Sequence, residues 1–210
     1  MKTKLFHNII SLGRSAGFNE RHALGVNKTA LMLFDQLQDL HRMGNTEKLW
    51  LETAALLHDV GKSKNREIHH KLARDVITDF SDLPFGRKER RIIGLIARYH
   101  RGSLPSMEHK HFGQLDAESR HYIRKLASIL RIADGLVSGK SKIKALDCNI
   151  NKQEITVNLK CKKNISLNKA IKKANLFEYV FGKSVIFDLQ TIPDYNENSI
   201  TLIKSSFIAG

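Results

Sequence analysis

The chain has 210 residues, enough for one sizeable hydrophobic core or for one domain with a smaller appendage. Hydrophobic residues make up 41% and charged residues 27%, the balance of an ordinary globular protein, and the apolar stretches are too short to span a bilayer. Cys148 and Cys161 cannot form a disulfide framework, and polar residues interrupt the apolar N-terminal patch, so we expect no secretory signal and a cytoplasmic protein without membrane contact.

The net charge of +14 is concentrated in part near the C-terminal end. Residues 140–183 hold eleven lysines and three acidic residues, which is a net charge of +8. Such a field attracts polyanions such as polyphosphate, nucleic acid, nucleotides or anionic lipid, and it does not select among them. The alternative interpretation is that these lysines only keep the surface soluble.

Most of the first 138 residues show apolar side chains at the three- and four-residue spacing of helices. A long helix is expected to open at Asn19 or Glu20 and to end near Met43. Thr46 is expected to cap the next helix, which Gly61 interrupts. Prolines and glycines mark the connections between further helices. These helices are expected at Ile68–Phe80, at Arg87–His100 and from Asp116 to about Val137.

The pattern changes after Gly139. Alternating apolar residues between 148 and 161, around a polar turn at 151–154, predict a β-hairpin. A helix that starts at Ser166 or Asn168 and stops at Gly182 follows, and then a strand at 184–189. The expected fold is mainly α, with a helical domain in 1–139, a basic α+β subdomain of ββαβ order in 140–190 and a tail of unknown structure in 191–210.

The adjacent residues His58 and Asp59 are the strongest local signal of chemistry. They end an apolar helix, where an unpaired carboxylate is costly, so we expect a partner cation there. His22, His100 and Asp134 lie beside apolar residues on other predicted helices, and helical bundles build metal sites from such residues. The structural alternative is that each is a polar residue satisfied by ordinary hydrogen bonds.

The order of these residues resembles the metal-binding signature of the HD superfamily of phosphohydrolases. The resemblance implies an all-helical, HD-type bundle that binds one or two divalent ions. Nitrogen and oxygen ligands without sulfur suit Mn, Fe, Mg, Zn or Ni, and the sequence leaves the choice open. The residues matched to a first ion are His22, His58, Asp59 and Asp134.

For a second ion, the resemblance points to His70 and His100, with Asp59 as the bridging ligand, although His69 competes with His70 for this role. A water between two ions is deprotonated near neutral pH and attacks phosphorus, so Asp59 is a candidate catalytic residue.

Three basic side chains are candidates for binding the phosphate of a substrate. Lys62, one turn past Asp59, is the first, and it is also a candidate catalytic residue; its alternative is an ordinary solvated lysine. Arg101 and Arg131 are secondary candidates. The remaining histidines, His7, His41, His109, His111 and His121, are expected at the surface.

Six short blocks carry a closer resemblance, which covers roughly residues 5–190. They resemble, in order, the C-terminal half of the exopolyphosphatase and guanosine-pentaphosphate phosphatase family, as does the basic region 142–189. The blocks are 30–40 (ALMLFDQLQDL), 53–61 (TAALLHDVG), 68–71 (IHHK), 81–84 (SDLP), 96–104 (IARYHRGSL) and 126–136 (LASILRIADGL).

The chain departs from that family in two ways. The resemblance implies that the family's phosphatase site lies in two actin-like domains that precede this region; the 210 residues include no match to them, so we do not expect the resemblance to transfer that activity. A basic run, 62–66, also stands where the family has more aromatic character.

Three functions therefore stay open. The first is a metal-dependent phosphohydrolase that acts on a phosphate ester or anhydride of a nucleotide or related polyanion. The second is a non-catalytic module that binds polyphosphate, RNA or a protein through its basic region, which includes Lys162, Lys163, Lys172 and Lys173. The third is a regulatory subunit of a separately encoded actin-like phosphatase, and a homodimer is also open.

Overall fold

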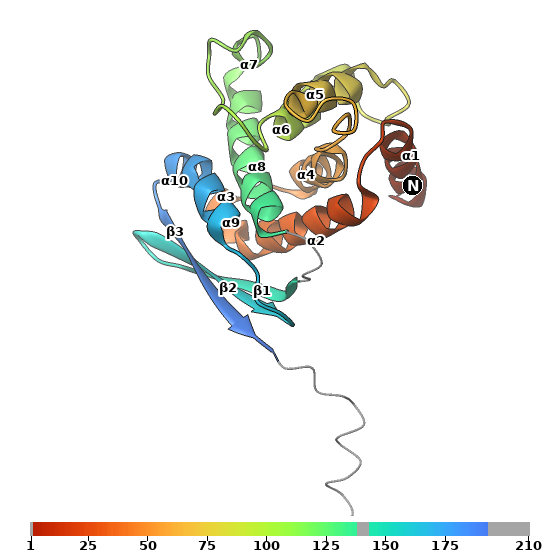
Figure 1. The fold of residues 1–210 in the computed structure, drawn as a ribbon. Coiled ribbons are helices and arrows are strands. Elements are labelled where there is room, and N and C mark those ends of the chain that lie inside the picture. Colours follow the sequence, from red (N-terminus) through yellow and green to blue (C-terminus); the bar gives the residue numbers. More distant parts are fainter. Residues whose placement is uncertain (1, 138–142, 193–210) are drawn as a thin grey trace, which may run out of the picture.

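The computed structural model describes residues 2–137 and 143–192, with side chains from residue 5 on, and places a helical bundle beside a small sheet (Figure 1). The first part is helical, as predicted. Its helices are α1 (Lys2–Ser15), α2 (Glu20–Gln36), α3 (Gln38–His41), α4 (Asn45–Leu57), α5 (His69–Asp79), α6 (Arg87–Arg98), α7 (Lys110–Gly113) and α8 (Ala117–Leu136).

Side-chain caps fix where several helices begin. The side chain of Asn19 accepts a hydrogen bond from the backbone N–H of His22 at the start of α2, and Asp116 accepts one from Ser119 at the start of α8. The start of α4 is different from the prediction, because Asn45 is already helical and the carboxylate of Glu47 accepts from the N–H of Gly44. The observed cap is Gly44, so the expected cap at Thr46 is wrong by two residues.

The long helix expected to reach Met43 breaks at Leu37, and α3 completes the segment. The imidazole of His41 explains the break. Its Nε2 lies 2.7 Å from the carbonyl oxygen of Phe34, and its Nδ1 accepts from the N–H of Met43 at 2.9 Å. His41 is buried, so its expected surface position is wrong.

Helix α1 was not predicted, because polar residues interrupt its apolar pattern. Its buried side chains Ile9, Ile10 and Leu12 join the core, and the helix packs against α4. The short helix α7 was also not predicted.

Helix α4 lies at the centre of the bundle and contacts α1, α2, α6 and α8. Its side chains from Ala54 to Leu57 are fully buried, in agreement with a segment predicted to bury on several sides. The pair His58 and Asp59 directly follows this helix, so the bundle holds the start of the candidate site rigidly.

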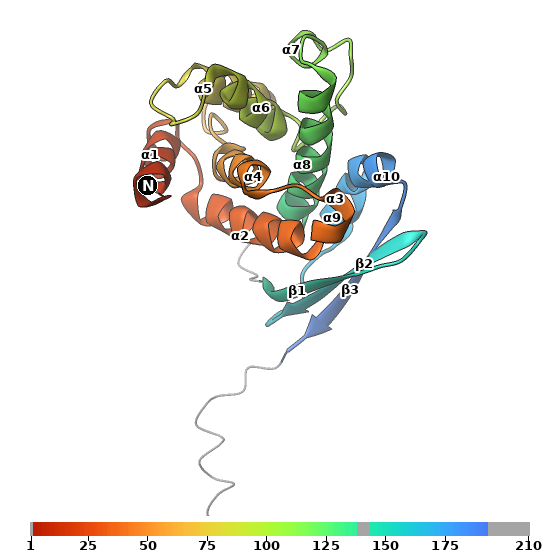
Figure 2. The ribbon, with the colours of Figure 1, turned by 180° about the vertical axis from the view of Figure 1, so that it is seen from behind.

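The C-terminal part forms the predicted ββαβ arrangement, seen from behind in Figure 2. Strands β1 (Ile143–Ile150) and β2 (Glu154–Cys161) are antiparallel, and Ile150 pairs with Ile155 at the hairpin. Strand β3 (Ser184–Thr191) pairs with β2 in parallel, so the order in the sheet is β1-β2-β3. Between β2 and β3, where a single helix was predicted, the chain forms two helices separated at Ala174, namely α9 (Asn168–Lys173) and α10 (Asn175–Phe181).

The sheet and the bundle are joined through helices. Helices α9 and α10 pack against α8, and β1 contacts α2. Residues Ile155, Val157, Leu159 and Cys161 of β2 are buried, which confirms the predicted alternation. The predicted domain boundary at 139/140 and most of the tail lie outside the described residues.

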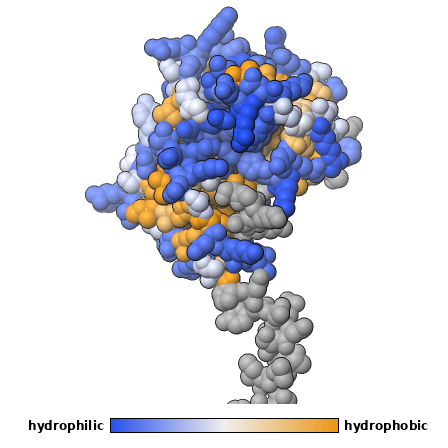
Figure 3. All heavy atoms as spheres, in the orientation of Figure 1, coloured by the Kyte–Doolittle hydropathy of each residue, from blue (hydrophilic) through white to orange (hydrophobic). Residues whose placement is uncertain are grey.

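The surface is mostly hydrophilic over the bundle, while hydrophobic side chains gather near the sheet (Figure 3). Ile150 and Ile186 in the strands and Ile171 in α9 are exposed. No helix in the described part of the chain is long and apolar enough to cross a membrane.

Candidate metal centre

The end of α4 turns sharply so that His58 and Asp59 face the inside of the bundle. Gly61 makes this turn possible, because its φ of 81° lies in the left-handed region that favours glycine. A Cβ at Gly61 would also lie 3.0 Å from the Cβ of Leu72. The N–H of Gly61 donates to the carbonyl of Ala16 at 3.1 Å, which ties the turn to the end of α1.

Three buried histidines share one orientation. In each, Nδ1 lies at hydrogen-bonding distance from the backbone carbonyl three residues earlier, so Nδ1–H donates and Nε2 carries the lone pair in the neutral ring. These contacts are His58 to Ala55 at 2.7 Å, His69 to Arg66 at 2.8 Å and His100 to Ala97 at 2.7 Å.

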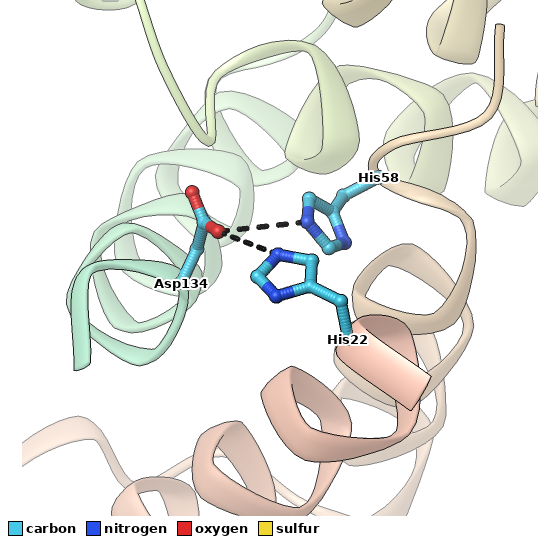
Figure 4. Close-up of side chains that lie close together, drawn as sticks. All are labelled: His22, His58 and Asp134. Carbon is cyan, nitrogen blue, oxygen red and sulfur yellow. Dashed lines mark hydrogen bonds and ion pairs between the residues drawn. The ribbon is translucent and has the colours of Figure 1, made fainter. Parts of the chain in front are cut away.

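The Nε2 atoms point at two carboxylates that come from different parts of the chain. Oδ1 of Asp134, on α8, lies 3.1 Å from Nε2 of His22, on α2, and 3.7 Å from Nε2 of His58. Figure 4 shows these three side chains converging from three directions. His22, His58 and Asp134 therefore meet at one point, as the sequence predicted.

Asp59 faces two groups of histidines with its two oxygens. Its Oδ2 lies 3.7 Å from Nε2 of both His22 and His58. Its Oδ1 lies 3.0 Å from Nε2 of His69 and 3.8 Å from Nε2 of His100. Asp59 therefore lies between His22 and His58 on one side and His69 and His100 on the other.

The structure brings His69, and not His70, to Asp59. His69 is the first residue of α5 and only 1% exposed. The ring of His70 is perpendicular to that of His69, and its Nδ1 is buried without a hydrogen-bond partner. The sequence left these neighbours in competition, and the start of α5 decides which ring faces the carboxylate.

Each carboxylate also forms an ion pair with the ammonium group of a lysine. Nζ of Lys62 lies 2.5 Å from Oδ2 of Asp59, and Nζ of Lys173 contacts Oδ2 of Asp134. Lys173 is the last residue of α9 and was predicted to belong to the basic surface. Its side chain instead reaches inward and is 21% exposed. Sequence reasoning missed this role because only the packing of α9 on α8 brings the two residues together.

The pKa values of both carboxyl groups are low. Burial alone would raise the pKa of Asp59, but His69, the other facing imidazoles and Lys62 outweigh burial and hold it well below its usual range. Burial would also raise the pKa of Asp134, yet His22, His58 and Lys173 hold it far below its ordinary value. Both groups are therefore anionic at neutral pH.

The pKa values of His58 and His100 move in opposite directions. Burial lowers the pKa of His58, but the Asp134 carboxylate more than compensates, so the pKa is raised. Burial lowers the pKa of His100 well below its usual value, and the neighbouring His58 adds to this. His100 is thus neutral at pH 7, with Nε2 free to bind a cation.

The two candidate arginines have structural partners. Arg101 donates to the carbonyl of Arg66 at 3.3 Å, the same carbonyl that accepts from His69, so it braces the loop before α5. Arg131 is buried, which lowers its pKa, while the nearby Asp134 carboxylate acts in the opposite direction. Its guanidinium donates to the carbonyls of Tyr99, Gly102 and Lys173 and to the side chain of Asn175.

The remaining histidines lie away from the cluster. His7, His111 and His121 are exposed, as predicted. His109 is half-buried, and its Nδ1 lies 2.9 Å from the hydroxyl of Tyr99, so the expected surface position is wrong.

The donor atoms fit divalent metal ions. Nε2 of His58 and of His69 are buried and have no hydrogen-bond partner, although each faces a carboxylate oxygen. Around an ion bound at about 2.0–2.2 Å, neighbouring ligand atoms lie about 3–3.5 Å apart. The donor pairs above are separated by 3.0–3.8 Å. Within the part of the chain that the structure describes, two groups meet the spacing for an ion, His22 with His58 and Asp134, and His58 with Asp59 and His100.

The fold and the cluster define the class of protein: a mainly helical domain whose bundle encloses a histidine and aspartate site, with a small α+β piece attached. The family model of the Ppx/GppA phosphatase domain III matches residues 7–179, which is most of the chain. The chain therefore belongs to this family. A search of curated proteins found no match.

Proposed function

We propose that the cluster binds one or two divalent cations and that the protein is a metal-dependent phosphohydrolase of the HD type. Its substrate would be a phosphate ester or anhydride of a nucleotide or a related polyanion. The relation to the Ppx/GppA phosphatases supports a phosphate-containing substrate. The HD assignment is carried by the cluster itself.

The observation that carries the proposal is the common orientation of His58, His69 and His100. Each ring donates Nδ1–H to the backbone and turns Nε2 toward carboxylate oxygens. A lone pair that faces an anion is repelled unless a proton or a metal ion lies between them. The backbone hydrogen bonds fix the tautomer that a metal ion needs.

The donor set indicates the type of ion. Imidazole nitrogens outnumber carboxylates, and sulfur is absent, which favours Mn, Fe, Ni or Zn over Mg. Such ions, when bound, lower the pKa of a coordinated water and stabilise charge on phosphoryl oxygens. His22, His58, Asp59 and Asp134 would hold the first ion, and Asp59, His69 and His100 the second.

The partly exposed Lys62 offers positive charge to a phosphate at the edge of the cluster. Lys62 is 38% exposed, more than the other side chains of the cluster, and it also borders a shallow depression of about 520 Å³. Arg66 lines the same depression. Lys62 would leave Asp59 to bind an incoming phosphate, because ammonium groups bind phosphate as point charges.

Phosphate release from a panel of substrates tests the proposal. The protein would be stripped of metal, reloaded with Mn²⁺ or Zn²⁺, and offered nucleoside triphosphates, cyclic dinucleotides, tripolyphosphate and an aryl phosphate, and chromatography would follow the products that release no free phosphate, such as linear dinucleotides. Asp59→Asn should abolish turnover, whereas Asp39→Asn, an exposed position in α3, should not. Turnover that Asp59→Asn leaves intact, or none with any substrate, would contradict the proposal.

A second function, binding of polyphosphate or RNA without catalysis, is favoured by one observation. Exposed lysines cover the C-terminal part, namely Lys144, Lys152, Lys160, Lys162, Lys163, Lys169 and Lys172. Binding would weaken steeply with salt and persist when His58 and Asp59 are both replaced. Charge reversal of Lys160, Lys163 and Lys172 should remove it, and unchanged binding would exclude this function.

A further inference from the structure

Lys173, from the C-terminal part of the chain, places a positive charge in the cluster of candidate metal ligands. Its Nζ contacts Oδ2 of Asp134, while Oδ1 of the same carboxylate faces His22 and His58. Asp134 is thus shared between the imidazoles of the bundle and an ammonium group that the bundle itself does not supply.

Close packing between α8 and α9 places this lysine. A Cβ at Gly135 would lie 2.6 Å from Cα and 2.8 Å from the backbone nitrogen of Ala170, so only glycine allows α9 to come this near. Gly135 follows Asp134 directly, and Lys173 lies less than one helical turn past Ala170. Because the two helices lie this close, the ammonium group of Lys173 reaches the carboxylate of Asp134.

Arg131, on α8, stabilises the same contact between α8 and the end of α9. Its guanidinium donates to the carbonyl of Lys173 at 3.4 Å and to Oδ1 of Asn175 at 3.2 Å. It also donates to the carbonyl of Tyr99 at 3.1 Å and to that of Gly102 at 3.4 Å, on either side of His100. One buried side chain therefore links the end of α9 to the turn that carries His100.

Each of the two carboxylates has an ammonium partner. Asp59 has the ammonium of Lys62, and Asp134 has that of Lys173. A divalent cation at Asp134 would lie next to the charge of Lys173 in a largely buried place, where like charges repel more strongly than in water. The ion and the ammonium cannot both make their best contact with one carboxylate.

We propose that the ammonium group of Lys173 competes with a divalent ion for the carboxylate of Asp134. This competition couples metal binding to the docking of α9 and α10 on the bundle. Binding of the ion displaces the ammonium and loosens the end of α9. Docking of α9 in turn lowers the affinity for the ion. This inference rests on the metal site proposed above.

Metal affinity measured by calorimetry tests the inference without any activity assay. The full chain, stripped of metal, would be titrated with Mn²⁺ and with Zn²⁺. Lys173→Met should bind at least one of these ions roughly tenfold more tightly than the unaltered protein, a factor within the usual range for coupled sites. Lys173→Arg should bind like the unaltered protein, because the charge stays.

Lys172→Met is the matched control. Lys172 is exposed on the same helix and precedes Lys173 directly, so its removal changes the net charge equally but should leave the affinity unchanged. Circular dichroism would show that each variant is folded, and Lys173→Gln would replace Lys173→Met if the latter is not.

The outcomes separate the inference from the proposed function. If Lys173→Met and Lys173→Gln bind the ions as weakly as the unaltered protein, the inference is overturned while the metal site stands. If none of the proteins binds an ion, the metal site is overturned, and the competition that depends on it falls too.

Discussion

His69 faces Asp59 across the candidate metal centre, with its Nε2 3.0 Å from Oδ1 of the carboxylate. The neighbouring His70 instead lies near Gly102 and Arg98, so the first residue of α5 is the one that completes the second group of donors. This relationship separates two adjacent histidines that look equivalent in the sequence.

Replacement of His69 should therefore reduce the number of bound ions. We expect His69→Ala to bind about one ion fewer than the unaltered protein, because Asp59 and His100 alone are too few protein ligands for a stable site. His70→Ala should keep the full number. Metal analysis after gel filtration measures both. Loss of an ion from His70→Ala but not from His69→Ala would contradict the assignment.

The cap of α2 should contribute measurably to stability. Asn19→Ala removes the side-chain acceptor for the N–H of His22 and should lower the free energy of unfolding by about 1 kcal/mol. Asn19→Ser, which keeps a capping oxygen, should lose much less. Urea unfolding compares the two. Equal losses would show that the cap is not the cause.

Stability should fall in mildly acidic solution, in part because of His41. Burial lowers the pKa of His41 and outweighs the hydrogen bond to the backbone of Phe34, which acts in the opposite direction, as Asp35 and Glu47 do; Lys125 lowers the pKa further. The folded state thus keeps a neutral ring where the unfolded chain takes up a proton. His41 therefore stabilises the fold above about pH 6.5, and this contribution is lost as the pH falls toward the lower folded value.

His41→Gln tests this effect of pH. The variant should be less stable than the unaltered protein at pH 7.5, because the hydrogen bonds to Phe34 and Met43 are disturbed. The difference between the two proteins should shrink at pH 5.5. Urea unfolding at both values measures it. A difference that does not change with pH would contradict the prediction.

The close approach of α9 to α8 should make Gly135 intolerant of any side chain. Gly135→Ala places a Cβ 2.6 Å from the backbone of Ala170 and should cost about 1–3 kcal/mol of unfolding free energy. His121→Ala, at an exposed position of the same helix, should have little effect. If Gly135→Ala were as stable as the unaltered protein, the two helices would not be packed this closely.

Much of the fold follows from local patterns in the sequence. Apolar spacing and capping residues located α2, α4, α5, α6 and α8, and the alternation around Asn151 located the hairpin. Helix α1 was missed because its polar residues hide an apolar face that only the contact with α4 reveals. The break at Leu37 was missed because it depends on the ring of His41 folding back on Phe34.

The candidate site could be predicted where its residues are neighbours in the sequence. It could not be predicted where packing brings distant residues together. His58 and Asp59 stand out as adjacent residues at the end of an apolar helix. The partners of Arg131 and Lys173 lie about 30 to 44 residues away in the sequence, so no local sequence pattern predicts these contacts. Both were therefore assigned to phosphate or polyanion binding, whereas the structure places them in contacts between α8 and the C-terminal helices.

Anomalous X-ray diffraction from crystals soaked in Mn²⁺ tests the metal centre most directly. We predict a strong peak between His22, His58, Asp59 and Asp134, with a second near His69 and His100 when both ions bind. Crystals of Asp59→Asn should lack these peaks. Peaks only elsewhere, for example at His109 or His111, or no peak at all, would contradict the account.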